Sequence, residues 1–111
     1  MAFGDITPAK LGQAAITAAA VTVYTVPAST RTMIKNIDIC NTTAASINIT
    51  VYLVPSGGSP TTANALFFEM ALAAKSLFQW SGVQILNVGD TIRVQGSAVG
   101  CTVNASGGEA I

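Results

Sequence analysis

The sequence predicts an all-β fold, namely a single antiparallel β-sandwich or jelly-roll-like domain of seven to eight short strands. Apolar residues recur with a period of two over most of the 111 residues, which is the pattern of strands with one buried face. Clusters of Gly, Pro, Ser and Asn separate the alternating runs and favour turns there. The runs follow one another at a spacing of about 10 residues, which is typical of sandwiches and barrels.

The first strands are expected within residues 11–26, the most apolar run of the chain. This run is too short and too rich in Thr to cross a membrane as a helix. Its β-branched end stops at Pro27, which cannot donate a hydrogen bond to a ladder. One or two strands are therefore predicted before residue 27.

Two hairpins are predicted further along the chain. Residues 32–41 and 45–54 alternate and are joined by a short polar connection, and residues 91–95 and 99–105 are joined through Gly96. In the first pair, the residues expected to face the core are Met33, Ile37, Ile39, Ile47, Ile49, Val51 and Leu53. The opposite face of residues 32–41 is expected to carry Ile34, Asn36, Asp38 and Cys40.

One more strand is expected over residues 64–72. Its alternation predicts a core face made of Leu66, Phe68, Met70 and Leu72. Residues 70–75 are the one stretch where a turn of helix would fit.

Residues 1–12 are predicted to form an N-terminal arm, with the sandwich domain over residues 13–111. Pro8 and Gly12 interrupt any strand pattern there. The arm carries three isolated apolar residues, Phe3, Ile6 and Leu11. Two interpretations stay open: a frayed terminus, or an arm that docks these side chains on a neighbouring subunit.

The low charge of the chain suggests which partners it has. Charged residues make up 9% of the chain and the formal net charge is zero, against about 25% charged residues in typical soluble domains. Such a surface is suited to contact with other protein copies, although a poorly charged monomer is the alternative. The five bases are spread along the chain and form no basic patch, so nucleic acid is not an expected partner.

Most catalytic chemistry is disfavoured by composition. The chain has no histidine, which removes the usual base that activates a Ser or Cys nucleophile. Its five acidic residues are separated in sequence, so no catalytic pair or metal site is marked, and neither a cofactor nor a small-molecule substrate is expected. Cys40 and Cys101 are interpreted as buried thiols, and a bridge between them stays open. No secretory signal is recognised.

Four aromatic residues lie close together in sequence, namely Phe67, Phe68, Phe78 and Trp80. With Phe68 expected in the core, Phe67 and Trp80 are expected to point outward and are candidate partner-binding residues. Three roles stay open for such rings: sealing one end of the core, anchoring a subunit interface, or stacking on sugar rings.

Several segments together resemble small virion structural proteins of tailed bacteriophages. They are residues 22–27, 34–37, 39–42 and 51–58 in the first half, and residues 71–74, 89–92 and 105–107 in the second. The similarity runs from Leu11 onward and consists of strand and turn patterns, so no functional residue carries over.

The resemblance implies a capsid decoration (cement) protein. Such a protein would be made in the host cytoplasm and sit on the outer capsid surface of the virion as a homotrimer. Its partners would be the major capsid protein and copies of itself. Rival interpretations are an internal tail or connector component, and a head- or tail-fibre domain that binds host carbohydrate through Phe67, Trp80 or residues 55–60.

Overall fold

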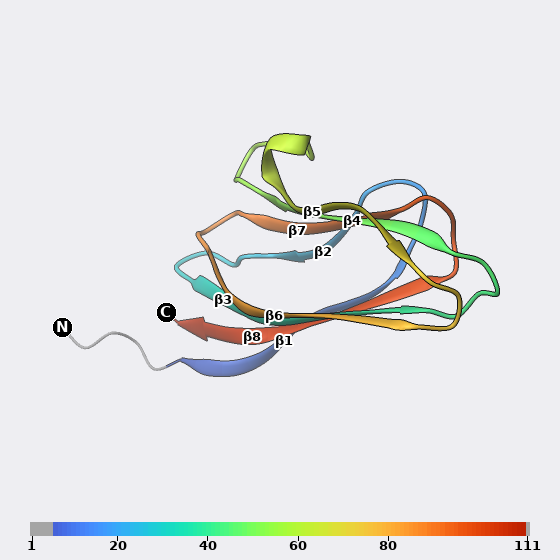
Figure 1. Ribbon diagram of the computed structural model, residues 1–111. Helices are drawn as coiled ribbons and strands as arrows, with labels where there is room; N and C mark the ends of the chain where they lie inside the picture. Colours follow the sequence, from blue (N-terminus) through green and yellow to red (C-terminus); the bar gives the residue numbers. More distant parts are fainter. Residues whose placement is uncertain (1–5, 111) are drawn as a thin grey trace.

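Eight strands and one short 3-10 helix make up the chain, which a computed structural model describes over residues 6–110. The elements are β1 (Thr7–Ile16), β2 (Val21–Thr25), β3 (Arg31–Asn41), β4 (Ile47–Val54), η1 (Thr62–Asn64), β5 (Ala65–Leu72), β6 (Leu77–Leu86), β7 (Thr91–Gly96) and β8 (Cys101–Ala110). The strands form two four-stranded sheets that face each other (Figure 1). The predicted all-β sandwich is therefore confirmed.

The strand order identifies the sandwich as a jelly roll. Sheet A has the order β1-β8-β3-β6, and sheet B has the order β2-β7-β4-β5. Partners are nested along the chain, since β1 pairs with β8, β2 with β7, β3 with β6 and β4 with β5, all antiparallel. This is one long hairpin rolled up so that successive strands alternate between the two sheets, apart from β4 and β5.

Both predicted hairpins are wrong in their pairing. β3 pairs with β6 and β8, whereas β4 pairs with β5 and β7. β7 and β8 likewise lie in different sheets. Stacked sheets are only about 10 Å apart, so a connection of a few polar residues spans the sandwich as easily as it closes a hairpin. Sequence spacing does not separate these two cases.

The expected boundary between arm and sandwich at residue 12 falls inside β1, which pairs with β8 along its length. Pro8 is accommodated because β1 is an edge strand. The register shifts between Lys10 and Gly12, and this bulge turns Leu11 into the core. Gly12 lies against the backbone of Val23, where a Cβ atom would overlap the Val23 carbonyl oxygen.

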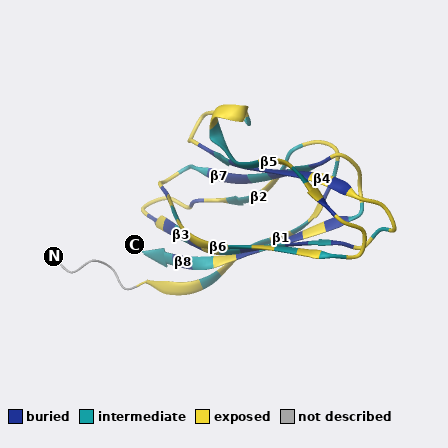
Figure 2. Ribbon diagram, in the orientation of Figure 1, coloured by how far each residue is buried: buried dark blue, intermediate teal, exposed yellow. Residues whose placement is uncertain are grey.

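The core lies between the sheets, where the buried residues gather (Figure 2). Its fully buried members include Ile34, Ile37, Ile39, Ile49, Val51, Ile92, Val94 and Val103. Ile34 was expected on the opposite face from Ile37. The register of β3 shifts between Ile34 and Asn36 against both of its neighbours, and this bulge at Lys35 brings Ile34 and Ile37 to the same side.

Cys40 and Cys101 are both free thiols. They lie on neighbouring strands, but Cys40 is paired with Thr102 and Cys101 with Asn41. Alternation along the strands therefore points the two thiols to opposite faces of sheet A, and burial raises the pKa of the Cys101 thiol. Within residues 6–110, no helix has the length and apolar character needed to span a membrane.

Candidate binding surfaces

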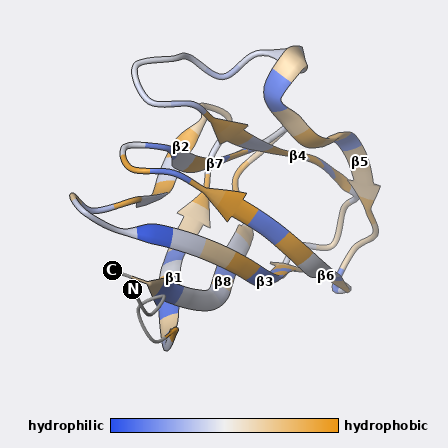
Figure 3. Ribbon diagram, turned by 90° about the vertical axis from the view of Figure 1, so that its left-hand side faces the viewer, coloured by the Kyte–Doolittle hydropathy of each residue, from blue (hydrophilic) through white to orange (hydrophobic). Residues whose placement is uncertain are grey.

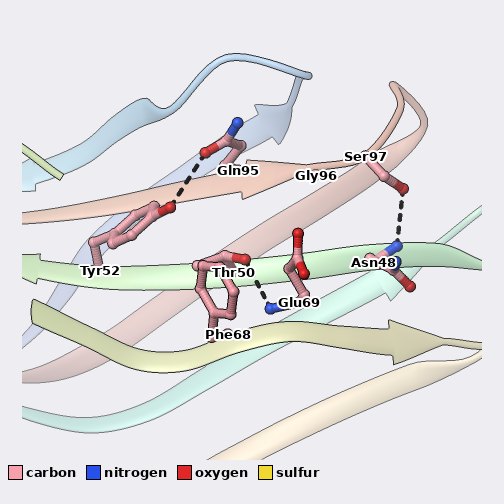
Figure 4. Close-up of a pocket in the computed structure, with 8 residues that line it drawn as sticks. All are labelled: Asn48, Thr50, Tyr52, Phe68, Glu69, Gln95, Gly96 and Ser97. Carbon is pink, nitrogen blue, oxygen red and sulfur yellow. Dashed lines mark hydrogen bonds between the residues drawn. The ribbon is translucent and has the colours of Figure 1, made fainter. Parts of the chain in front are cut away.

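The outer face of sheet B is hollowed into a groove of about 240 Å³ (Figure 4). We call it the outer groove and define it by the residues that line it: Asn48, Thr50, Tyr52, Phe68, Glu69, Gln95, Gly96 and Ser97. These residues come from three adjacent strands, β4, β5 and β7, and from the first residue after β7. The alternation of β4 predicted the outward direction of Asn48, Thr50 and Tyr52.

Hydrogen bonds fix the floor of the outer groove. The Tyr52 hydroxyl donates to Gln95 Oε1 at 3.4 Å, and Gln95 Nε2 donates to the carbonyl oxygen of Ala18 at 2.9 Å. At the other end, the backbone N–H of Asn48 donates to Ser97 Oγ at 3.0 Å. Tyr52 and Thr50 are buried even though they lie on the outer face, so their positions are set by packing as well as by these bonds.

A bulge in β5 builds the remaining wall. Ile49 is paired with Met70 and Val51 with Phe67, so Phe68 and Glu69 together lie opposite the single residue Thr50. Glu69 has a φ of 48°, and its N–H donates to Thr50 Oγ1 at 2.8 Å. This bulge inverts the predicted phase of the strand: Phe68, expected in the core, is 51% exposed, whereas Phe67 packs against the core.

Trp80 and Phe67 are not the outward rings that the sequence predicted. Trp80 is paired with the buried Ile37 and packs against the core. Phe67 meets Phe78 edge to face. Their placement agrees with the alternative in which these rings seal one end of the core. The exposed ring of the cluster is Phe68, and only knowledge of the bulge would have revealed it.

A second surface lies at one end of the outer face of sheet A. Ile6, Met33 and Ile85 line a small apolar hollow there, with Gly108 beneath Ile6 and Arg31 also in the lining. Ile6, a predicted partner-binding residue, is 57% exposed at this position. Leu11 is not available in the same way, because it is 6% exposed and belongs to the core. Phe3 lies outside the described residues.

The four edge strands differ in how well they are protected against pairing with another chain. β1 carries Pro8, Lys10 and a bulge, β2 has only 5 residues, and β5 carries Glu69 and two shifts of register. These are the usual devices that discourage edge-to-edge pairing. β6 has 10 residues, and no charged residue occurs between Lys75 and Asp90. Its one irregularity lies near Gly82, where its register against β3 shifts.

β6 also presents apolar side chains to solvent. Leu77, Val83 and Ile85 are all more than half exposed, and Figure 3 shows hydrophobic colouring at the C-terminal end of the strand. With Ile6 and Met33 beside Ile85, these residues form what we call the β6 surface: Ile6, Met33, Leu77, Val83 and Ile85. The low charge of the sequence signalled such a surface, but not its location.

Among residues 6–110, no group of three or more His, Cys, Asp or Glu side chains is placed to hold a metal ion. The surfaces described above therefore offer hydrogen bonding and apolar contact as their chemistry.

Comparisons with known proteins bear on the fold. No protein-family model matches the chain, and no curated protein matches it either. A solved structure of Bacillus endospore appendages, described as a novel family of disulfide-linked pili, is similar over 99% of this chain and 93% of its own, with 16% identity and a TM-score of 0.50. This likeness extends over both chains almost completely and supports the jelly roll as a fold for a chain of this length.

Two structures of infectious bursal disease virus are also similar. The Gt strain chain is 10% identical with a TM-score of 0.44, and the Gx strain chain is 11% identical with a TM-score of 0.38. Each matches 96% of this chain, which spans only 30% and 39% of the length of those viral chains. The chain is thus a small β-rich protein whose structural neighbours come from a pilus and from a virus.

Proposed function

We propose that this chain is a non-enzymatic structural protein that works as one of many copies in a larger assembly. The observation that carries the proposal is the β6 surface. β6 is a long edge strand without charge, and it presents exposed apolar side chains beside an open row of backbone groups.

The physical argument concerns what happens when such an edge meets a second copy. Backbone N–H and C=O groups of an edge strand readily pair with another strand, and the paired copy would also cover Val83 and Ile85. Burial of apolar area contributes about 25 cal/mol per Å². Because β6 carries no charge, two copies of it meet without repulsion between like charges.

The finer proposal is a capsid decoration protein that assembles as a homotrimer on the outer surface of a virion. It is supported by the resemblance to phage virion proteins and by the low charge of the chain. A closed ring of three copies would use a head-to-tail contact between the β6 surface and another face of the next copy. Because such a protein binds only the assembled shell, its binding would stabilise the shell.

Light scattering after size-exclusion chromatography tests the assembly proposal. The wild-type chain is expected to elute as an oligomer, and Val83→Lys and Ile85→Lys are expected to shift it towards the monomer. Val99→Lys is the matched control, since Val99 is also an exposed valine but lies in the loop before β8. A monomeric wild type at every concentration, or variants that associate as the wild type does, would contradict the proposal.

The form of the oligomer tests the finer proposal. A stable trimer that sediments with empty capsids supports decoration. Open-ended filaments in negative-stain electron microscopy would instead favour an appendage subunit, the role named for the Bacillus neighbour, and would overturn the decoration role.

A further inference from the structure

The outer groove holds side chains that the rest of the described chain does not use. The carboxylate of Glu69 and the side-chain amide of Asn48 make none of the hydrogen bonds that fix the groove, since Glu69 is held through its backbone N–H and Asn48 likewise. Figure 4 shows the Glu69 carboxylate between the Phe68 ring on one side and Asn48 with Ser97 on the other. An apolar ring, a carboxylate and an amide therefore lie side by side around one hollow.

We infer that the outer groove binds a neutral saccharide. The half-exposed face of Phe68 offers a platform on which the C–H face of a pyranose ring packs. The Glu69 carboxylate accepts hydrogen bonds from sugar hydroxyls, and hydrogen bonds to an ionised acceptor are roughly twice as strong as neutral ones. Asn48 and Ser97 both donate and accept, which matches the character of hydroxyl groups.

The charge of the lining sets the class of saccharide. Glu69 is the one charged residue among the eight that line the groove, and no base lines it. An acidic sugar would place its carboxylate next to that of Glu69 and would be repelled. A neutral chain of hexoses or N-acetylhexosamines meets no such repulsion.

The backbone at Glu69 supports a role for its carboxylate. A φ of 48° lies in the left-handed region, where Gly or Asn is favoured and other residues are strained. Strain of this kind collects at functional sites, and bulges re-aim side chains there. The bulge turns Phe68 and Glu69 towards the groove together.

A lysine side chain from another protein is the competing occupant. It would satisfy Glu69 and contact Phe68, but it has no acceptor and would leave the polar groups of Asn48 and Ser97 without a use. The mixed donors and acceptors along the groove therefore favour the polyhydroxy ligand.

The test is binding of the full chain to a printed glycan array carrying neutral and acidic oligosaccharides, followed by calorimetry on the strongest neutral glycan. Phe68→Ala and Glu69→Asn are each expected to weaken binding by roughly tenfold or more, about 1.4 kcal/mol or above. Asn tolerates the left-handed backbone, so the second variant removes the carboxylate while keeping the bulge. Val99→Ala is the control and should bind as the wild type does.

Three results would overturn the inference: no neutral glycan bound above background, variants that bind like the wild type, or binding of a hexalysine peptide instead of any glycan. Far-ultraviolet circular dichroism and thermal unfolding of both variants check that the fold is kept. The inference stands apart from the proposed assembly role, because the groove lies on sheet B and the β6 surface on sheet A. Light scattering and glycan binding on the same sample therefore succeed or fail separately.

Discussion

The ring of Phe67 in β5 meets the ring of Phe78 in β6 edge to face, with ring centroids 5.1 Å apart and an angle of 64° between the planes. The two strands belong to opposite sheets and are not paired with each other. The two rings thus join the sheets along the side of the sandwich where β5 and β6 form the edges.

This aromatic pair should matter for stability. Phe78→Ala is expected to lower the free energy of unfolding by about 2–3 kcal/mol, below the fully buried range because Phe78 is only partly covered. Urea denaturation measures the change. A double-mutant cycle with Phe67→Leu and Phe78→Leu should give a coupling of about 1 kcal/mol. Phe68→Ala is the control and should cost less than about 1 kcal/mol.

Asn41 is a buried clamp between two connections. Its Nδ2 donates to the carbonyl oxygens of Ala45, Leu72 and Ala73 at 2.8, 3.1 and 3.2 Å. Its Oδ1 accepts from the N–H and the hydroxyl of Thr43 at 2.9 and 2.7 Å.

Asn41→Ala leaves several of these groups without a partner in the interior, so the free energy of unfolding should fall by about 2–3 kcal/mol. Asn41→Asp should be at least as harmful, because a carboxylate cannot donate to three carbonyls. Thermal unfolding measures both, with the exposed Thr42→Ala as comparison. Equal melting temperatures for Asn41→Ala and wild type would contradict the clamp.

Tyr24 links stability to alkaline pH. Burial and a hydrogen bond to Glu109 raise its pKa to about 12, above the ordinary value of 10.0, and its hydroxyl also lies 2.7 Å from Thr32 Oγ1. A raised pKa means that the folded state favours the protonated phenol. This contribution is complete below pH 10 and is lost as the pH rises towards 12.

The comparison that isolates this effect is Tyr24→Phe. The wild type should be more stable than the variant by about 1 kcal/mol near neutral pH. The difference should shrink as the pH rises from 10 to 12, as measured by urea denaturation at each pH. A difference that stays constant over this interval would show that the phenol does not titrate as described.

Gly107 lies where β8 passes closest to β3. A Cβ atom at this position would overlap the carbonyl oxygen of Met33, which is backbone and cannot rotate away. Gly107→Ala should therefore displace the pairing beside the β3 bulge and cost about 2 kcal/mol or more. Gly57→Asn is the matched control, since Gly57 has a φ of 76° and open space around it, and its cost should be below about 1 kcal/mol.

The two thiols should react differently in the folded protein. Cys101 is buried and Cys40 is partly exposed, and the raised pKa of Cys101 lowers its thiolate fraction further. Under native conditions an aromatic disulfide reagent should modify Cys40 well before Cys101. In urea both should react at similar rates. An intact mass lower by the loss of two hydrogens would reveal a bridge and contradict the assignment of free thiols.

The candidate surfaces were only partly predictable. The polar side of β4, which forms the floor of the outer groove, followed from simple alternation. Phe68 and Glu69 did not, because their direction depends on where β5 inserts an extra residue against β4. Ile6 was predicted as a contact residue and is exposed, whereas Leu11, with the same pattern around it, is drawn into the core by the bulge in β1.

The sequence by itself determined the class of fold. Period-two alternation and turn residues specify short strands with one apolar face, and two such sets of faces must cover each other. Which strands pair was decided only in the tertiary structure, because a short connection can stay in one sheet or cross to the other. The bulges at Lys35 and Glu69 were likewise decided there. Each adds one residue against a partner strand, and with a side-chain period of two, one residue reverses every direction beyond it.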